Sequence, residues 1–342
     1  MKTVLVTGGA GYIGSVLIGE LFKVGYKVRV LDRMFFGFQM IEAYQDNPDF
    51  QLIKDDIRYF DEGLLKGVDT VVDLAGLAND PTCDIDPKAT KSINHLGCVR
   101  VARLAKKMGV ERYIFSSSCS IYGQAGKGGL TEDAPRNPVS LYAEAKAKAE
   151  EDILPLAGND FCATVLRSAT VYGLSPKMRF DLVVNVMTMR ALTQGVIYVL
   201  GGGKQWRPNV HVRDVAKAFM LVMEADKAKV NGQIFNVGSS EQNYQVLQIA
   251  SMVRDVIPNA RVENVPSDPD KRSYSVCFDK IRDVLNYRAD RTVPEGILEI
   301  KRALENGVVD PTDRRTKTVD YYRYLLEAQN ALKGITYKGR IF

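Results

Sequence analysis

The chain has 342 residues, of which 46% are hydrophobic and 25% charged, a composition typical of folded globular proteins. Its length suggests about two domains or one large one. The 46 basic residues exceed the 41 acidic residues only slightly and are spread evenly along the chain. The charge therefore gives no indication of a nucleic-acid-binding or membrane-surface protein.

Metal binding, disulfide bonds and membrane insertion are not expected either. Five cysteines without a close pair and only two histidines offer too few ligands for a zinc site. The first residues lack the layout of a signal peptide, and no segment approaches the roughly 20 apolar residues that span a bilayer. We expect a cytoplasmic protein with free thiols.

Short β-branched runs alternate with longer helical patterns through the first half of the chain, which is typical of a parallel sheet covered by helices on both faces. The expected strands are residues 3–7, 27–32, 51–55, 70–75, 112–117 and 162–167. The expected helices are residues 13–24, 93–108 and 142–156.

Beyond Gly173 the pattern is less regular. A strand at 233–237 is expected to return to the main sheet, and a helix at 319–332 contains Tyr321, Tyr322 and Tyr324, which we interpret as packing residues. The predicted organisation is a first domain at 1–174 with a returning segment near 208–240, a smaller interrupted domain at 175–310, and a helical tail at 311–342.

A glycine-rich turn separates the first expected strand from the first helix. The stretch Thr7–Gly14 reads TGGAGYIG, and its glycines fit the G-x-G-x-x-G spacing. Such a turn lets the backbone approach a pyrophosphate, which the N–H groups and the positive end of the following helix stabilise. The motif predicts dinucleotide binding by Gly8, Gly11, Tyr12, Ile13 and Gly14.

Asp32 ends the second expected strand, 18 residues after Gly14. A carboxylate there accepts hydrogen bonds from the adenosine ribose and repels a 2′-phosphate, so it favours NAD over NADP. The adjacent Arg33 weakens this inference, because a guanidinium can pair with that phosphate.

Tyr142 and Lys146 are four residues apart and share one face of an expected helix. A phenol is a poor base at neutral pH, but a neighbouring ammonium group favours its ionised form. The serine run at 116–118 follows an expected strand, at the edge of the sheet where ligands approach.

These motifs, in this order, resemble the extended short-chain dehydrogenases/reductases, within them the NAD-dependent nucleotide-sugar epimerase/dehydratase group to which UDP-glucose 4-epimerases belong. The resemblance extends from residue 7 to about residue 300. It implies an α/β fold, with a Rossmann-type doubly wound parallel sheet and a smaller α/β domain that binds the nucleotide sugar. It is carried by the glycine turn, Asp32, Asp56-Ile57, Leu74-Ala75-Gly76, Asn94, the serine run, Tyr142 with Lys146, and residues 207–214.

The resemblance also implies roles at the cofactor. Asp56 and Ile57 would border the adenine, and residues Leu74, Ala75 and Gly76 would run beneath the cofactor. Asn94 would hold the active-site helix within the cofactor site, although a buried polar residue without contact to the cofactor is an equal interpretation.

For catalysis, the resemblance implies that Tyr142 removes a proton from a sugar hydroxyl while the adjacent carbon gives a hydride to NAD. Ser118 would hydrogen-bond the same sugar oxygen. Lys146 would anchor the nicotinamide ribose and lower the pKa of the tyrosine.

On the substrate side, the implied ligands of a nucleotide-diphosphate sugar are Ser118, Thr170, Asn185, Arg207 and Arg272. Two of these positions depart from the family pattern. Only the second family arginine, Arg272, is matched in residues 267–272, and Thr170 replaces the usual asparagine. His211 lies in an apolar run and is interpreted as structural.

The residues after Ser118 narrow the reaction. Sugar 4,6-dehydratases of this family have Asp-Glu there, whereas this chain has Cys119-Ser120. We therefore expect hydride removal and return at one carbinol, most simply as epimerisation at C4. The alternatives are an NAD(H)-dependent dehydrogenase or 4-keto-reductase, a shifted role for Cys119 as a base, and a non-catalytic NAD-binding protein.

Family members commonly form homodimers through a four-helix interface. In this chain the corresponding helices are residues 93–108 and 142–156, so the resemblance implies a homodimer of the same kind. The sequence leaves open the sugar, the nucleotide base and the direction of the reaction.

Overall fold

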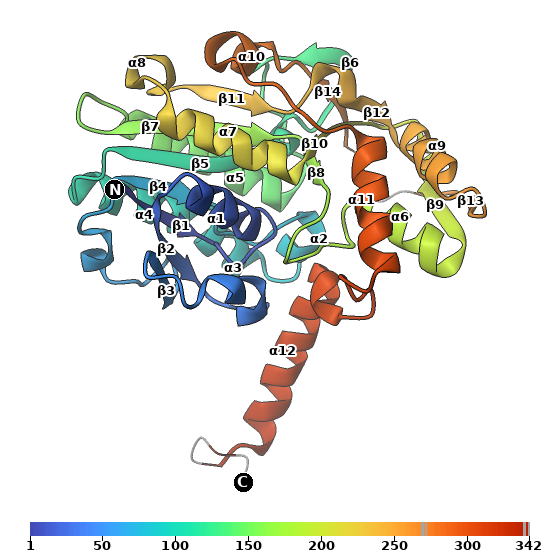
Figure 1. Cartoon of the computed structure of the whole chain (residues 1–342), viewed down its shortest axis with the longest axis horizontal. Helices are drawn as coiled ribbons and strands as arrows, with labels where there is room; N and C mark the ends of the chain where they lie inside the picture. The colour runs from blue at the N-terminus through green and yellow to red at the C-terminus, as the bar shows by residue number, and fades with distance from the viewer. Residues whose placement is uncertain (268–269, 271, 338–339, 341–342) are drawn as a thin grey trace.

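The computed structural model describes residues 1–267, 270, 272–337 and 340. Seven of its strands are β1 (Thr3–Thr7), β2 (Lys27–Asp32), β3 (Phe50–Lys54), β4 (Thr70–Asp73), β5 (Arg112–Ser118), β7 (Cys162–Ser168) and β11 (Ile234–Val237). They form one parallel sheet in the order β11-β7-β5-β4-β1-β2-β3 (Figure 1). The strand order reverses between β1 and β4, which opens a crevice at the carboxyl ends of these strands.

The expected strands are all present, and β11 joins the main sheet beside β7 as predicted. The strand expected at 70–75 ends earlier, at Asp73. The Asp73 carboxylate accepts hydrogen bonds from the hydroxyls of Thr7 and Tyr113. The chain bends away after this anchored residue, so Leu74 and Ala75 leave the strand and line the crevice.

The helices are α1 (Gly14–Lys23), α2 (Asp80–Cys83), α3 (Pro87–Thr90), α4 (Cys98–Lys107), α5 (Leu141–Ile153), α6 (Val183–Gln194), α7 (Val212–Glu224), α8 (Lys227–Val230), α9 (Val246–Val256), α10 (Asp279–Leu285), α11 (Val293–Glu305) and α12 (Thr318–Ile335). The helix expected at 93–108 begins as a π-helical turn, η4 (Lys91–Gly97). The helix expected at 142–156 ends in a 3₁₀ turn, η6 (Leu154–Leu156), because Pro155 has no N–H for the α-helical pattern.

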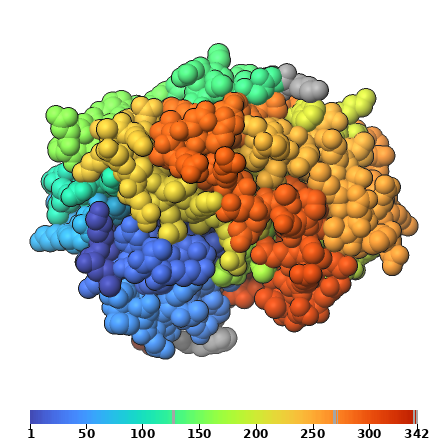
Figure 2. All heavy atoms as spheres, turned by 45° about the horizontal axis from the view of Figure 1, so that its top comes forward, coloured from blue at the N-terminus to red at the C-terminus, as the bar shows by residue number. Residues whose placement is uncertain are grey.

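Two apolar layers cover the main sheet. Along β1, Val4 and Val6 pack toward α1 and α7, whereas Leu5 packs toward α4 and α5. This alternation is expected of a strand buried on both faces. Figure 2 shows the face where α7 (yellow) lies beside the N-terminal elements (blue), with the orange segments of the last third of the chain alongside.

The remaining strands are β6 (Gln124–Leu130), β8 (Thr170–Tyr172), β9 (Val196–Leu200), β10 (Trp206–His211), β12 (Asn243–Gln245), β13 (Arg261–Val265) and β14 (Ser273–Val276). They form three small sheets, β12-β10-β8, β13-β9 and β14-β6. Helices α6, α9 and α11 share a separate apolar cluster with β9. The predicted domain boundaries at 174 and 310 stay predictions.

Helix α12 starts against the body of the molecule and then projects away from it (Figure 1). Tyr322 packs edge-on against Phe35, and Tyr321 contacts Phe36, with ring centroids 5.6 Å apart in both pairs. These two tyrosines are packing residues, as predicted, while Tyr324 is 43% exposed. Among the described residues, no helix is long and apolar enough to span a bilayer.

An ion pair buried beneath α5 fixes this helix to the sheet. Glu150 is fully buried and accepts hydrogen bonds from Ser117 of β5 and from Arg167 of β7, whose Nη2 lies 2.7 Å from Oε2. Burying a charge is costly unless it is paired, so removing one partner is far more harmful than removing a surface pair.

We expect Glu150→Gln to lower the free energy of unfolding by about 3–5 kcal/mol, because it leaves the Arg167 charge unpaired in the interior. Urea denaturation measures this change. The matched control is Glu151→Gln, which loses only a surface contact with Arg136 and should cost no more than about 1 kcal/mol. Equal losses in the two variants would contradict the argument.

Candidate functional site

A cleft of about 350 Å³ opens at the carboxyl ends of the central strands. It collects residues from both halves of the chain, including thirteen of the fourteen residues that sequence analysis assigned to the cofactor. Those thirteen are Gly8, Gly11, Tyr12, Ile13, Gly14, Asp32, Asp56, Ile57, Leu74, Ala75, Gly76, Tyr142 and Lys146.

The glycine turn leaves room only for backbone. Gly8 has φ +66°, and a Cβ there would lie 2.9 Å from the Ala75 Cα. A Cβ on Gly14 would lie 2.5 Å from the Gly8 carbonyl oxygen. Helix α1 begins at Gly14 with no acidic residue in its first turn, so its N-terminal N–H groups face the cleft without a competing carboxylate. This cradle fits a dinucleotide diphosphate.

Asp32 lies at the end of β2 and stabilises the turn. Its Oδ2 accepts a hydrogen bond from the Ala10 N–H at 3.0 Å, and its Oδ1 accepts one from the Met34 N–H at 2.7 Å. Burial raises its pKa above the usual value. The Nε of Arg33 lies 3.7 Å from Asp56, so the guanidinium has a carboxylate of this chain as its partner.

Asn94 is the one predicted cofactor residue that does not line the cleft. It is fully buried, its Oδ1 accepts the Leu77 N–H at 2.7 Å, and its Nδ2 donates to the Leu77 carbonyl at 2.9 Å. Both amide groups are therefore used on the backbone that follows β4. Asn94 thus holds the backbone of the cleft wall, which favours the interpretation of a buried polar residue without contact to the cofactor.

Ser118, Tyr142 and Lys146 all line the cleft. Lys146 is 4% exposed, and its Nζ donates to the Ser116 carbonyl at 2.7 Å. Burial raises the pKa of Tyr142 above its ordinary value, and the Lys146 charge offsets only part of that rise. The predicted effect of the lysine has the right sign, but in this protein burial outweighs it.

The residues after Ser118 point in opposite directions. Cys119 is fully buried outside the cleft, with its Sγ 3.2 Å from the Arg167 carbonyl oxygen, and burial raises its pKa. The alternative in which Cys119 acts as a base is therefore wrong. Ser120 does line the cleft, and its buried Oγ has no hydrogen-bond partner among the described residues.

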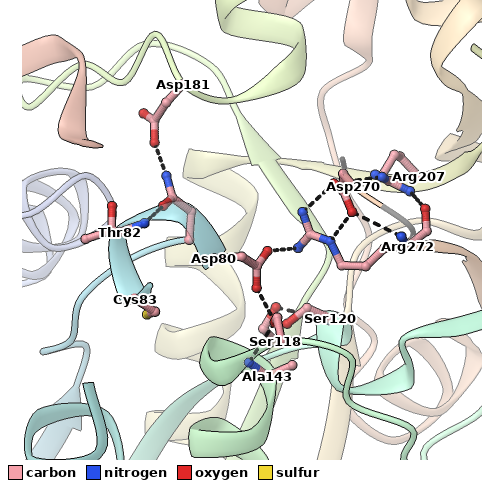
Figure 3. A network of polar contacts seen from close by, with 12 residues as sticks. Asp80, Thr82, Cys83, Ser118, Ser120, Ala143, Asp181, Arg207, Asp270 and Arg272 are labelled. Carbon is pink, nitrogen blue, oxygen red and sulfur yellow. Dashed lines mark hydrogen bonds and ion pairs between the residues drawn. The ribbon is translucent and has the colours of Figure 1, made fainter. Parts of the chain in front are cut away.

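A polar network around Arg207, Asp270 and Arg272 lines another part of the cleft (Figure 3). The guanidinium groups of Arg207 and Arg272 pair with Asp270 at 2.9 and 2.6 Å. Although burial acts to raise it, these arginines hold the pKa of Asp270 at about 2. Arg272 also pairs with Asp80 at 2.6 Å, and Asp80 accepts a hydrogen bond from Ser140, the N-cap of α5. The network thus links the arginines to the helix that carries Tyr142.

Thr170 lines the cleft with Arg207 and Arg272, but Asn185 does not. The Asn185 side chain is fully buried and donates to the Tyr12 hydroxyl and the Arg179 carbonyl, while its Oδ1 accepts the Gly173 N–H. These contacts do not favour its assignment as a substrate ligand, which stays a prediction. His211 pairs with Glu299 at 2.9 Å away from the cleft, which agrees with a structural role.

Several cleft residues were missed by sequence analysis. They are Phe36, Lys177, Arg179, Asp181, Asp270, Thr318 and Tyr322, and behind them Asp80 pairs with Arg272. A signal was present in the stretch PKMRFD, residues 176–181, where three charged residues interrupt apolar sequence. No local pattern indicated the contact of α12 with the loop after β2, because these segments are far apart in the chain.

The sheet, the glycine turn and the cleft together define an NAD-dependent enzyme of the doubly wound class. The chain belongs to the NAD dependent epimerase/dehydratase family, whose model matches residues 4–238. The fold class, the family and the NAD cofactor predicted from sequence are thereby confirmed.

Relatives in this family carry out different reactions. The chain is 30% identical to a UDP-glucose 4-epimerase of Mycolicibacterium smegmatis, over 90% of this chain and 99% of that protein. It is also 30% identical to UDP-glucuronic acid decarboxylase 4 of Arabidopsis thaliana, over 86% of this chain, and the match spans 66% of that longer protein.

Among solved structures, MoeE5 in complex with UDP-glucuronic acid and NAD superimposes with a TM-score of 0.78. That match has 27% identity and covers 89% of this chain and 99% of MoeE5. A UDP-glucose 4-epimerase of Thermotoga maritima, solved with UDP-glucose, gives a TM-score of 0.79 at 26% identity, over 90% of this chain and 100% of that one.

We expect Asp32→Asn to weaken NAD binding by about tenfold to a hundredfold, because hydrogen bonds to a charged acceptor contribute about 1.5–3 kcal/mol. Discrimination against NADP should also fall, since the repelling charge is gone. Titration with both dinucleotides measures the effect, with the exposed Asp46→Asn as control. An unchanged ratio of the two affinities would argue against Asp32 as the ribose ligand.

Proposed function

We propose that this protein is an NAD-dependent nucleotide-sugar epimerase that oxidises one sugar hydroxyl, at C4, to a ketone and then returns the hydride to the opposite face. The proposal is carried by one observation. Ser118, Tyr142 and Lys146 line the same cleft as the glycine turn, and Arg207 and Arg272 line it as well. The cleft can thus hold a dinucleotide and a diphosphate-linked sugar together.

The residues of the cleft divide the chemistry between them. NAD supplies the hydride acceptor when bound. Tyr142 takes the proton of the sugar hydroxyl, and the Ser118 hydroxyl hydrogen-bonds the same oxygen. Lys146, fixed by the Ser116 carbonyl, stabilises the phenolate by its charge, which matters because burial disfavours that ion.

The same groups favour epimerisation over loss of water. Elimination across C5 and C6 needs an additional acid and base next to the sugar. The position after Ser118 holds Cys119, which is buried outside the cleft. Ser120 lines the cleft, but its hydroxyl is neither a carboxylic acid nor a carboxylate base. With one proton-transfer group at the reacting carbon, hydride removal and return is the reaction that this set of residues supports.

Decarboxylation of a nucleotide-linked uronic acid is the second candidate, favoured by the similarity to the plant UDP-glucuronic acid decarboxylases. It begins with the same oxidation, because a ketone at C4 lies β to the carboxyl group on C5 and so allows loss of carbon dioxide. Loss of carbon dioxide leaves an enol, which takes up a proton at C5 before the hydride returns to the ketone at C4.

The two reactions are distinguished by incubating the NAD-loaded protein with UDP-glucose, UDP-galactose and UDP-glucuronic acid. We expect NMR to show conversion of a sugar into its C4 epimer without a net change in absorbance at the NADH band. Release of carbon dioxide and a pentose product would select decarboxylation. Stoichiometric NADH formation would identify a dehydrogenase instead.

We expect Tyr142→Phe to lower kcat by about 10²–10⁴-fold, since it removes the proton-transfer group, while NAD still binds. Tyr198→Phe, a change on β9 outside the cleft, serves as the matched control and should leave kcat unchanged. A Tyr142→Phe variant with near wild-type turnover would remove this residue from the mechanism.

We also propose that Arg207 and Arg272 bind the substrate through its diphosphate.

We further propose that the protein is a homodimer. The paired helices η4-α4 and α5 are linked by His95 and Asp152 at 2.6 Å. Most side chains on the outward faces of these helices are charged, but Leu96 among them is 51% exposed and is an apolar residue that a second copy of the chain could cover. Light scattering at micromolar concentration is expected to give the dimer mass, and a monomer mass would refute this assembly.

A further inference from the structure

Lys177 is a buried cation on the wall of the cleft that the reaction does not use. Its side chain is 2% exposed. Its Nζ donates to the Thr318 hydroxyl at 2.9 Å and lies 3.9 Å from the ring centroid of Phe36. In the part of the chain that the structure describes, no ion pair joins this ammonium group to a carboxylate.

A buried ammonium group with only a hydroxyl and an aromatic ring as partners is unfavourable, because desolvation costs several kcal/mol. Burial and the neighbouring Arg179 lower the pKa of Lys177 to about 7, against the opposing effect of Asp181 and Asp313. An anion entering the cleft would provide the charged partner that the protein itself does not.

The position of Lys177 indicates which anion this is. Ser175, two residues earlier, donates to the Tyr12 carbonyl oxygen at 2.7 Å, and its Oγ lies 3.1 Å from that of Ser15. The segment that leads to Lys177 is therefore fixed against the glycine turn and the first residues of α1. This is the place where the backbone is shaped for the cofactor diphosphate.

The first turn of α12 completes this wall. Thr318, the first residue of the helix, holds the Lys177 ammonium group. Tyr322, one turn later, lines the cleft and packs against Phe35 and Phe36 from the loop after β2, with ring centroids 5.6 and 5.5 Å away. Burial and the nearby charge of Asp32 both raise the pKa of Tyr322, which agrees with a position of Tyr322 near the Asp32 carboxylate.

We propose that Lys177, held by the first turn of α12, binds the NAD diphosphate from the side opposite the glycine turn and so retains the cofactor in the cleft. The proposal rests on NAD binding and holds whichever sugar reaction the protein performs. Binding measurements test it without turnover, so its failure is distinguishable from failure of the epimerase proposal.

The test compares Lys177→Met with Lys317→Met, an exposed lysine next to the same helix start. Calorimetry at pH 6.5 measures the Kd values of NAD, ADP-ribose and UDP. We expect Lys177→Met to raise the Kd of NAD and ADP-ribose by about tenfold to a hundredfold and to leave that of UDP unchanged. Lys317→Met should change none of them, and Lys177→Arg should retain most of the affinity for NAD.

Two results would overturn the proposal. One is wild-type NAD affinity in a folded Lys177→Met variant. The other is a weaker affinity for UDP in place of NAD, which would assign the lysine to the substrate diphosphate.

The wild-type protein provides a readout that needs no variant. Because Lys177 binds phosphate only when protonated and its pKa is about 7, the Kd of NAD should rise about tenfold between pH 6.5 and 8.5. The groups that face it, Arg179, Asp181, Asp313 and Tyr322, have pKa values shifted away from this window. A flat profile would contradict the lowered pKa of Lys177.

Discussion

The buried carboxylate of Glu150 determines where the proposed catalytic helix lies. It joins α5 to β5 through Ser117 and to β7 through Arg167, within one turn of Lys146. The relative positions of Tyr142 on the helix and Ser118 at the end of β5 follow from this connection. The carboxylate has no solvent to replace a lost partner, so the geometry of the site and the stability of the fold depend on the same ion pair.

Several cationic side chains line the cleft, and most of them form an ion pair with a carboxylate of this chain. Asp270 holds Arg207 and Arg272, and Asp181 pairs with Arg179 at the cofactor side. Such pairs keep a guanidinium oriented, and because its N–H groups outnumber the oxygens of one carboxylate, Arg272 contacts both Asp270 and Asp80. Lys177 differs, since its described contacts are a hydroxyl and a ring.

The predicted site residues that the structure brings together in the cleft depend on local spacing. The glycine turn lies between a strand and a helix next to it in the chain, and Tyr142 and Lys146 share one face of a single helix. Asn94 and Asn185 do not line the cleft, and sequence could not indicate this, because an amide that binds a ligand and one that binds buried backbone look identical in sequence. They differ from the cleft residues in that their amide groups lie away from the cleft and bond to other groups of the chain, and such contacts are a property of the folded chain.

The contacts that sequence analysis missed join distant segments. Asp80 meets Arg272, and Phe36 meets Tyr322, across most of the length of the chain. Periodicity and turn signals act over a few residues and carry no information about such pairs. The role of α12 was therefore predicted only as packing, which is correct for Tyr321 and incomplete for Tyr322, because the latter also lines the cleft.

The place of Tyr322 in the cleft has a consequence for biosynthesis. Every other residue that lines the cleft precedes it in the order of translation. A nascent chain can thus form the central sheet and the glycine turn while the side of the cleft that Thr318 and Tyr322 line is still open. This part of the cleft wall forms only when residues 318–322 have been synthesised and have docked.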